Sequence, residues 1–182
     1  MVAVKQRVSV EEYLAIPDWR KPYLEYMDGE VREKVMGDLT HAGIVYAVSI
    51  AFGPHVRAFK GVAGPEVRCE FLGPNETAYL LPDFAYWPKG RPRNGVKAAL
   101  PPMLAVEVRS PGESMAAQRA KCRFYRDHGV EIAWLIDPRS ETVEVCEGEL
   151  DAAVLRAGRV LTSPLLPGFE LPVADLFVDD DE

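Results

Sequence analysis

Three ionisable side chains fall inside apolar stretches of this chain, where an unpaired charge is costly. Asp83 lies in L-L-P-D-F-A-Y-W, and Glu107 lies in M-L-A-V-E-V-R. Lys121 falls at helical spacing on an apolar stripe that includes Phe124 and Tyr125. Because a buried charge needs a partner, we expect these three side chains to meet one another, a cation, or both.

Two carboxylates and one ammonium suit the metal-assisted hydrolysis of a phosphodiester bond. Asp83 and Glu107, on neighbouring strands, would both present oxygen to one hard cation, and Mg²⁺ prefers a few carboxylates completed by water and substrate phosphate. Such an ion neutralises charge that grows on the phosphate and makes a water more acidic. Lys121 would orient the attacking water or help to deprotonate it, and would stabilise the transition state.

Each of these residues also has a structural interpretation. Asp83 follows Pro82 and would be equally suited to shaping a turn. Glu107 would be solvated on an open strand face beside Arg109, and Lys121 would reach solvent from the edge of its stripe. A buried Glu107–Lys121 ion pair would also satisfy both charges, and removing Glu107 would then destabilise the fold by roughly 3–5 kcal/mol.

Other polar residues could belong to the same site or serve the fold alone. Glu25, between two apolar residues, is a further candidate ligand for a metal ion or water, and His41 begins a predicted helix. A basic island without acidic residues lies between Pro88 and Pro102 and suits either phosphate contacts or a solvated loop. Its members are Lys89, Arg91, Arg93 and Lys97.

The elements that position these residues follow from apolar spacing and turn signals. Ser9 and Glu12 have the spacing of a capping box, and Asp28-Gly29 predicts a hairpin turn. The predicted helices are 9–16, 38–60 and 115–128, and the predicted strands are 23–27, 30–35, 65–72, 77–87, 101–109, 131–136 and 141–146. Helices on both sides of these strands predict an α/β or α+β layer fold.

Length and composition narrow the class of protein. The 182 residues, 48% hydrophobic and 27% charged, predict one globular domain with a buried core. Three scattered cysteines support neither a zinc knuckle nor a disulfide framework, and a net charge of −7 argues against a broad nucleic-acid-coating surface. No apolar run approaches the ~20 residues of a membrane span, and the N-terminus lacks a signal-peptide core. We therefore expect a cytoplasmic protein without membrane association.

The order of these motifs resembles the Uma-two family of restriction-endonuclease-like proteins, within the PD-(D/E)xK nuclease superfamily. His41 and the pair Lys121 and Tyr125 match positions of that family, and the resemblance covers nearly the whole chain. The matching blocks are Y-L-E-Y-M-D-G-E at 23–30, L-P-D at 81–83, V-E-V-R-S-P at 106–111, G-V-E-I-A-W-L-I-D-P at 129–138 and L-L-P-G-F-E-L-P-V-A-D-L-F at 165–177.

The resemblance implies a fold and a dimer. The expected fold is a restriction-endonuclease-like core, a central mixed β-sheet flanked by helices with an N-terminal β-hairpin. Within a single domain, 1–182, it comprises an N-terminal helix and hairpin (1–36), a nuclease core (37–147) and a C-terminal β and loop extension (148–182). Homodimers are common among relatives, so the same is expected here.

The resemblance also implies residue roles. Asp83 and Glu107, with the carbonyl of Val108, would hold Mg²⁺ or Mn²⁺. Lys121 would replace the catalytic lysine that lies two residues after the Glu in many relatives, and Glu25 would be an additional acidic residue. Further neighbours of the site would be His41, Arg109 and Tyr125.

Two departures from the family pattern bear on activity. Arg109 stands where relatives have an apolar residue, and it would project from the same strand face as Glu107 and crowd or replace the lysine. Ala117 stands where relatives often have Asp, so Lys121 would lack a partner. The sequence predicts a Mg²⁺-dependent endonuclease that cleaves DNA; the alternative is a catalytically retired nuclease scaffold that binds nucleic acid or regulates another protein.

Overall fold

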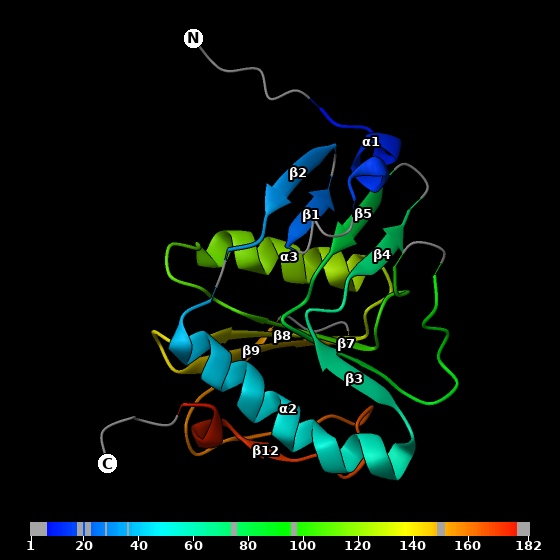
Figure 1. Ribbon diagram of the computed structural model, residues 1–182. Coiled ribbons are helices and arrows are strands. Elements are labelled where there is room, and N and C mark those ends of the chain that lie inside the picture. The colour runs from blue at the N-terminus through cyan, green and yellow to red at the C-terminus, as the bar shows by residue number, and fades with distance from the viewer. Residues whose placement is uncertain are drawn as a thin grey trace.

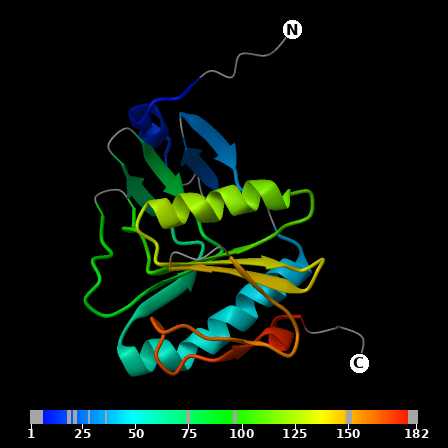
Figure 2. The same ribbon diagram turned by 180° about the vertical axis from the view of Figure 1, so that it is seen from behind.

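Two β-sheets of different size lie on either side of one helix, α3 (Met115–Asp127) (Figure 1). The computed structural model describes residues 7–17, 20, 23–27, 29–35, 37–73, 76–95, 98–148 and 152–177. Seen from behind, α3 runs between the small upper sheet and the large lower one (Figure 2). The junction between the sheets is therefore the place where segments distant in sequence meet.

The large sheet has six strands in the order β10-β9-β8-β7-β6-β3, and it is mixed because β7 and β8 are parallel while the other neighbours are antiparallel. Helix α2 (Leu39–Phe59) covers one face and α3 the other, which confirms the predicted fold class. The strands are β3 (Val62–Pro65), β6 (Phe84–Trp87), β7 (Leu104–Val108), β8 (Ile132–Asp137), β9 (Thr142–Glu147) and β10 (Ala153–Leu155).

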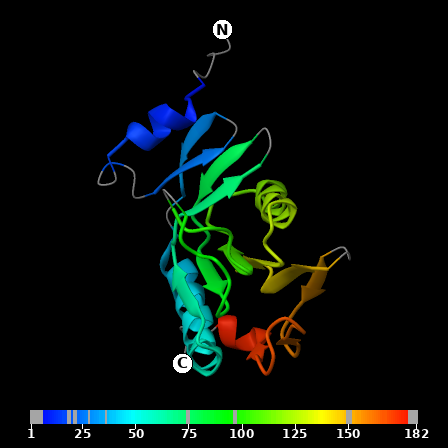
Figure 3. The same ribbon diagram turned by 90° about the vertical axis from the view of Figure 1, so that its right-hand side faces the viewer.

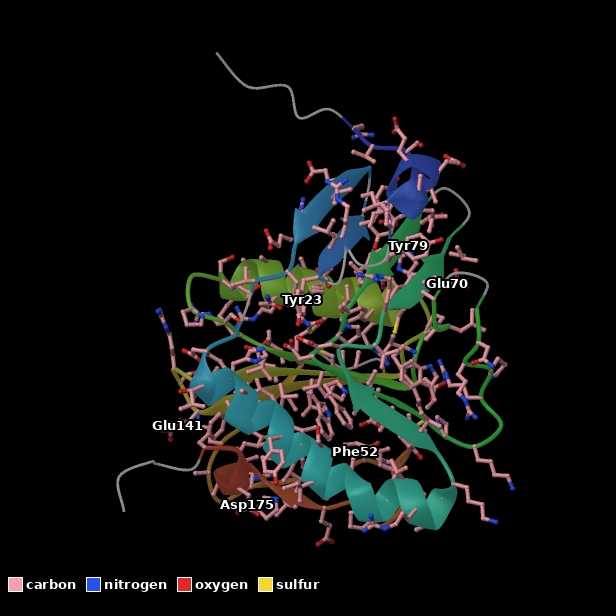
Figure 4. All side chains as sticks on the ribbon, in the orientation of Figure 1. Tyr23, Phe52, Glu70, Tyr79, Glu141 and Asp175 are labelled. Atoms are coloured by element: carbon pink, nitrogen blue, oxygen red, sulfur yellow. The ribbon has the colours of Figure 1, made fainter. Side chains whose placement is uncertain are left out.

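Alternation along the strands decides which side chains face which helix. Leu104 and Val106 of β7 join the core beneath α2, whereas Ala105 belongs to the cluster that packs against α3. Phe52 of α2 points towards the sheet in the same core (Figure 4). The C-terminal segment, β11 (Val160–Leu161), β12 (Leu171–Pro172) and the 3₁₀ helix η2 (Val173–Leu176), closes the α2 side (Figure 3).

The small sheet is antiparallel, with the order β2-β1-β5-β4. Helix α1 (Val10–Ala15) begins with the predicted capping box and packs Tyr13 against Tyr26 and Tyr79. Figure 4 labels Tyr79 in this upper part of the molecule. The hairpin is confirmed, although Asp28 of its turn lies outside the described residues. The strands are β1 (Leu24–Met27), β2 (Glu30–Glu33), β4 (Cys69–Leu72) and β5 (Thr77–Leu80).

The strands predicted at 65–72 and 77–87 were wrong as single strands, because each divides between the two sheets. β4 pairs with β5 in the small sheet, and β3 pairs with β6 in the large one. The chain crosses between sheets at Leu81–Asp83, where Pro82 has no N–H to give to a ladder. The opposite crossing follows β3 at Glu66, whose φ is 51°. These crossings place Asp83 at the junction.

Helix α2 combines a buried face with an exposed apolar one. Ile44, Val48 and Phe52 are buried, whereas Leu39 and Tyr46 are 81% and 68% exposed. Among the described helices, α2 alone has the length and apolar composition of a membrane-spanning segment, with a mean hydropathy of 1.2. In the fold it lies along the large sheet and supplies one side of the main core.

Candidate active site

The junction of the two sheets brings Asp83 and Glu107 together. Asp83 directly precedes β6, and the antiparallel pairing of Phe84 with Val106 sets it beside Glu107 on β7. Both carboxylates are 2% exposed, and both line a cavity of about 320 Å³. The two acidic residues that the sequence singled out therefore share one buried site on the α3 side of the large sheet.

Asp83 is held from two sides. Its Oδ2 accepts a hydrogen bond of 2.6 Å from the backbone N–H of Val108. Its Oδ1 lies 2.7 Å from Lys34 Nζ and 3.2 Å from His41 Nε2. At these distances the charges attract, yet Oδ1 makes no aligned hydrogen bond with any described residue. Oδ2 is therefore held by a backbone hydrogen bond, whereas Oδ1 is held by ion-pair contacts with Lys34 and His41.

Glu107 and Lys121 form the other half of the site. Lys121 Nζ lies 3.0 Å from Glu107 Oε1 and donates a hydrogen bond of 2.8 Å to Glu25 Oε1. The Tyr125 hydroxyl donates to the same Glu107 oxygen at 2.6 Å. Glu25 is fixed in turn by the backbone N–H of Leu81 at 2.8 Å. Strand β1, strand β7 and helix α3 therefore converge on one ammonium.

The protonation of this half is set by burial and by neighbouring charge. Burial raises the pKa of Glu107 to about 7; Lys121 opposes the rise and Asp83 adds to it. Burial alone would lower the pKa of Lys121, but Glu107 and Glu25 outweigh it and raise that pKa above its ordinary value. Lys121 is therefore an ammonium in this arrangement, suited to orienting a water or phosphate rather than to removing a proton.

The Asp83 half behaves differently. Burial would raise the pKa of Asp83, but contact with His41 and the charge of Lys34 lower it below its ordinary range. For His41, burial favours the neutral ring, yet the contact with Asp83 raises its pKa. Asp83 is therefore ionised at neutral pH, with cationic groups around its outer oxygen.

Arg109 does not crowd Glu107, so the expectation drawn from strand alternation was wrong. β7 ends at Val108, and the Arg109 guanidinium turns to Asp137 Oδ1 at 3.2 Å and to the Glu113 carbonyl at 2.9 Å. Ala117 lines the cavity, and Glu25 supplies the carboxylate that Lys121 would otherwise lack.

The basic island is not brought to the carboxylates. It follows β6 and precedes β7, at the end of these strands opposite to Asp83 and Glu107. Arg91 is used within the fold, donating to Glu131 and to the Gly129 carbonyl. Lys89 and Arg93 are exposed, and Lys97 lies outside the described residues.

Sequence reasoning missed several residues of the cavity wall, among them Lys34 and Gln118. Lys34 follows an amphipathic hairpin strand that reads as solvated, yet its side chain is only 9% exposed. Gln118 lies on α3 one turn before Lys121; it is 6% exposed, and within the described part of the chain its Oε1 has no hydrogen-bond partner. For Gln118 a signal existed, since it shares the helix face of Lys121 and Tyr125.

The two carboxylates suit a divalent cation, but the nearby ammonium groups of Lys34 and Lys121 would compete with it. Two buried carboxylates that line one cavity suit a hard cation. Among the described residues, no group of three or more His, Cys, Asp or Glu side chains could hold a metal ion. Any ion here would need backbone, water or substrate oxygen besides Asp83 and Glu107, and it would compete with Lys34 and Lys121.

Comparison with known proteins shows the family to which the chain belongs. The Uma2 family model, described as "Putative restriction endonuclease", matches residues 10–174. The chain belongs to the Uma2 family. The Uma-two resemblance in its sequence motifs is thereby confirmed.

A solved structure supports the fold. It is described as "a putative nuclease belonging to DUF820", from Anabaena variabilis ATCC 29413, and superposes with a TM-score of 0.79 at 24% identity over 93% of this chain and 97% of the other. A search of curated proteins gives no match.

Proposed function

We propose that this Uma2 protein is a metal-dependent endonuclease that hydrolyses phosphodiester bonds of DNA. The observation that carries the proposal is the meeting of Asp83, Glu107 and Lys121 in one cavity at the sheet junction. Each is an ionisable group that the fold keeps away from bulk water, at a cost that a purely structural core would avoid.

The residues divide the work by their positions. Asp83 and Glu107, with the Val108 carbonyl, would hold Mg²⁺ or Mn²⁺, which supplies neutralisation of charge on the phosphate when bound. The Lys121 ammonium, held by Glu25, orients the attacking water and stabilises charge that grows on the phosphate oxygens. The Tyr125 hydroxyl fixes the Glu107 carboxylate in its rotamer.

The retired-scaffold alternative rested on Arg109 and Ala117, and contacts in the site weaken both grounds. Arg109 is bound to Asp137 and leaves Glu107 accessible to a cation. Ala117 is compensated by Glu25, whose Oε1 lies 2.8 Å from Lys121 Nζ. These contacts support catalytic activity, and an activity measurement distinguishes the nuclease from the retired scaffold.

A DNA cleavage assay with matched variants tests the proposal. Linear single- and double-stranded DNA is incubated with Mg²⁺ or Mn²⁺ and with wild type, Glu107→Gln, Lys121→Met or Glu144→Gln. Glu144 is the control: it is a buried glutamate of the same sheet, 6% exposed, but it pairs with Arg119 away from the cavity.

Cleavage by wild type and Glu144→Gln, absent in the two site variants and abolished by EDTA, is the expected result. Equal activity in all four proteins would assign the cleavage to a contaminant or another site. An inactive wild type that also fails to bind Mn²⁺ at millimolar concentration would favour the retired scaffold.

The exposed face of α2 supports a homodimer as part of the proposal. Leu39, Tyr46 and Ile50 lie on it, 56% exposed or more, and no Asp, Glu, Lys or Arg occurs from Leu39 to Gly53. A second copy presents the same uncharged face, so two such helices would cover each other around a twofold axis. Light scattering should give a dimer for wild type and a monomer for Tyr46→Glu; a monomeric wild type would refute this element alone.

A further inference from the structure

Lys34 is the least expected member of the cavity wall. It directly follows β2, and its backbone N–H donates to the Tyr23 carbonyl at 2.8 Å, which fixes where the side chain starts. From there its ammonium reaches across the junction, donates to the Leu81 carbonyl at 2.6 Å and stops 2.7 Å from Asp83 Oδ1. An amphipathic hairpin would normally leave such a lysine in solvent.

Lys34 Nζ lies close to Asp83 Oδ1 as an ion pair, without an aligned hydrogen bond. Lys34 Nζ satisfies charge at Oδ1, while that oxygen still makes no aligned hydrogen bond to the described residues. Oδ2, by contrast, is firmly held by the Val108 N–H. The ammonium therefore occupies the side of Asp83 that a divalent cation would need, in an ion pair of 2.7 Å.

We propose that Lys34 is an exchangeable counter-cation: its ammonium neutralises Asp83 while metal is absent, and a divalent ion must displace it from Oδ1 to bind. This inference rests on the proposed metal-dependent function. A divalent ion bound at Oδ1 would lie close to the Lys34 ammonium, which is 2.7 Å from that oxygen, and the repulsion between the two charges is strong where the dielectric is low. Metal affinity is consequently reduced by whatever holds Lys34 in place.

Isothermal titration with MnCl₂ tests the exchange without any activity measurement. Lys34→Met removes the ammonium and keeps an unbranched side chain of similar length. The matched control is Arg32→Gln: Arg32 lines the same cavity, but its guanidinium pairs with Glu30 Oε2 at 2.6 Å rather than with Asp83. We expect Lys34→Met to bind Mn²⁺ roughly tenfold tighter than wild type, and Arg32→Gln to differ by less than about twofold.

The outcomes separate the inference from the function beneath it. Equal affinity in wild type and Lys34→Met would overturn the exchange and leave the metal site standing. Equal tightening in Lys34→Met and Arg32→Gln would also overturn it, because a general field effect would then explain both. Mn²⁺ binding by none of the proteins would refute the metal site and the exchange together.

A second measurement uses wild type alone and so does not depend on the folding of a variant. Lysines are acylated briefly with and without Mn²⁺, and the modified sites are quantified by mass spectrometry. Lys34 should be protected in the metal-free protein and gain several-fold in labelling when Mn²⁺ is added, while exposed Lys60 stays constant. Unchanged protection of Lys34 in the presence of bound Mn²⁺ would contradict the exchange.

Discussion

Asp83 and Asp137 are buried aspartates of one sheet, Asp83 directly before β6 and Asp137 at the end of β8, yet their surroundings differ in kind. Asp137 Oδ1 accepts from Arg109 and from the Arg139 backbone N–H, each at 3.2 Å, and its Oδ2 accepts from the Ser140 hydroxyl at 2.7 Å. Asp83 has one satisfied oxygen and one that attracts Lys34 and His41 without an aligned hydrogen bond.

The difference separates a carboxylate that is paired within the fold from one that we propose as a metal ligand. Asp137 needs nothing further, because each oxygen has a hydrogen-bond donor and the charge has Arg109. Asp83 shares its cavity with a second buried carboxylate, Glu107, and two lysines. Burial alone therefore does not identify a candidate site. The better indication is a buried carboxylate that shares a cavity with a second carboxylate and with cationic side chains.

Activity should separate the two aspartates most strongly. Asp83→Asn removes a charge that would hold the cation, so cleavage should fall on the order of 10³-fold, the rate equivalent of several kcal/mol. Asp137→Asn should leave the rate within about threefold, because the side chain does not line the cavity. The measurement is the initial rate of DNA cleavage under saturating Mn²⁺; similar losses in both variants would dissolve the distinction.

For stability, we expect the amide substitution of Asp137 to cost more than that of the site residue Glu107. Asp137→Asn loses charge-assisted bonds to Arg109 and Ser140 and should lower the free energy of unfolding by about 1–2 kcal/mol. For Glu107, the cost of burying the charge exceeds the attraction of Lys121. Glu107→Gln should therefore lower the free energy of unfolding of the metal-free protein by less than about 1 kcal/mol, or raise it. Urea unfolding in EDTA gives both values.

A loss of roughly 3–5 kcal/mol on Glu107→Ala would instead restore the interpretation of Glu107 and Lys121 as a structural ion pair. The same urea unfolding supplies this value. Because the alanine variant also leaves a cavity, Glu107→Gln separates the lost charge from the lost volume.

The sequence predicted the centre of the site because its members broke a local rule. Asp83, Glu107 and Lys121 are each charged within an apolar pattern, and that conflict is visible in a few residues of context. The fold class followed in the same way, since helical and strand periods are local. Glu25 was included on the same grounds, and the structure places it against Lys121.

Long-range contacts explain what the sequence could not predict. Lys34 and Arg109 break no local rule, and their partners Asp83 and Asp137 are fixed only by how the sheets assemble. The sequence did not predict the split of 77–87 into β5 and β6. A run buried on both faces lacks the apolar–polar alternation whose interruption would mark the end of a strand. Pro82 was the one local signal of that break.

Arg109 offers a direct test of its reassignment. Arg109→Leu should lower the free energy of unfolding by about 1 kcal/mol, because the bonds to Asp137 and to the Glu113 carbonyl are lost. Mn²⁺ affinity measured by calorimetry should stay within about twofold of wild type. Tightening of about tenfold would show that Arg109 does compete at Glu107, and it would return the residue to the site.

Asp137 and Glu107 should give opposite pH dependence in the metal-free protein. The contacts of Asp137 outweigh its burial and lower its pKa from the ordinary 3.8, so its ionised form stabilises the fold above that pH, and the contribution is lost as the pH falls through the folded pKa. Glu107 has its pKa raised from 4.5 to about 7, so its protonated form is favoured in the fold, and stability contributed at low pH is lost as the pH rises between these values.

Thermal melts in EDTA across pH 2.5–8 should show both slopes, of opposite sign. The gap between wild type and Asp137→Asn should close as the pH falls below 3.8 and through the lowered folded pKa of Asp137. Relative to Glu107→Gln, wild type should lose stability as the pH rises from about 4.5 to about 7. Parallel curves for wild type and Glu107→Gln would mean that the fold does not favour the protonated form of Glu107, and the contrast between Glu107 and Asp137 would fail.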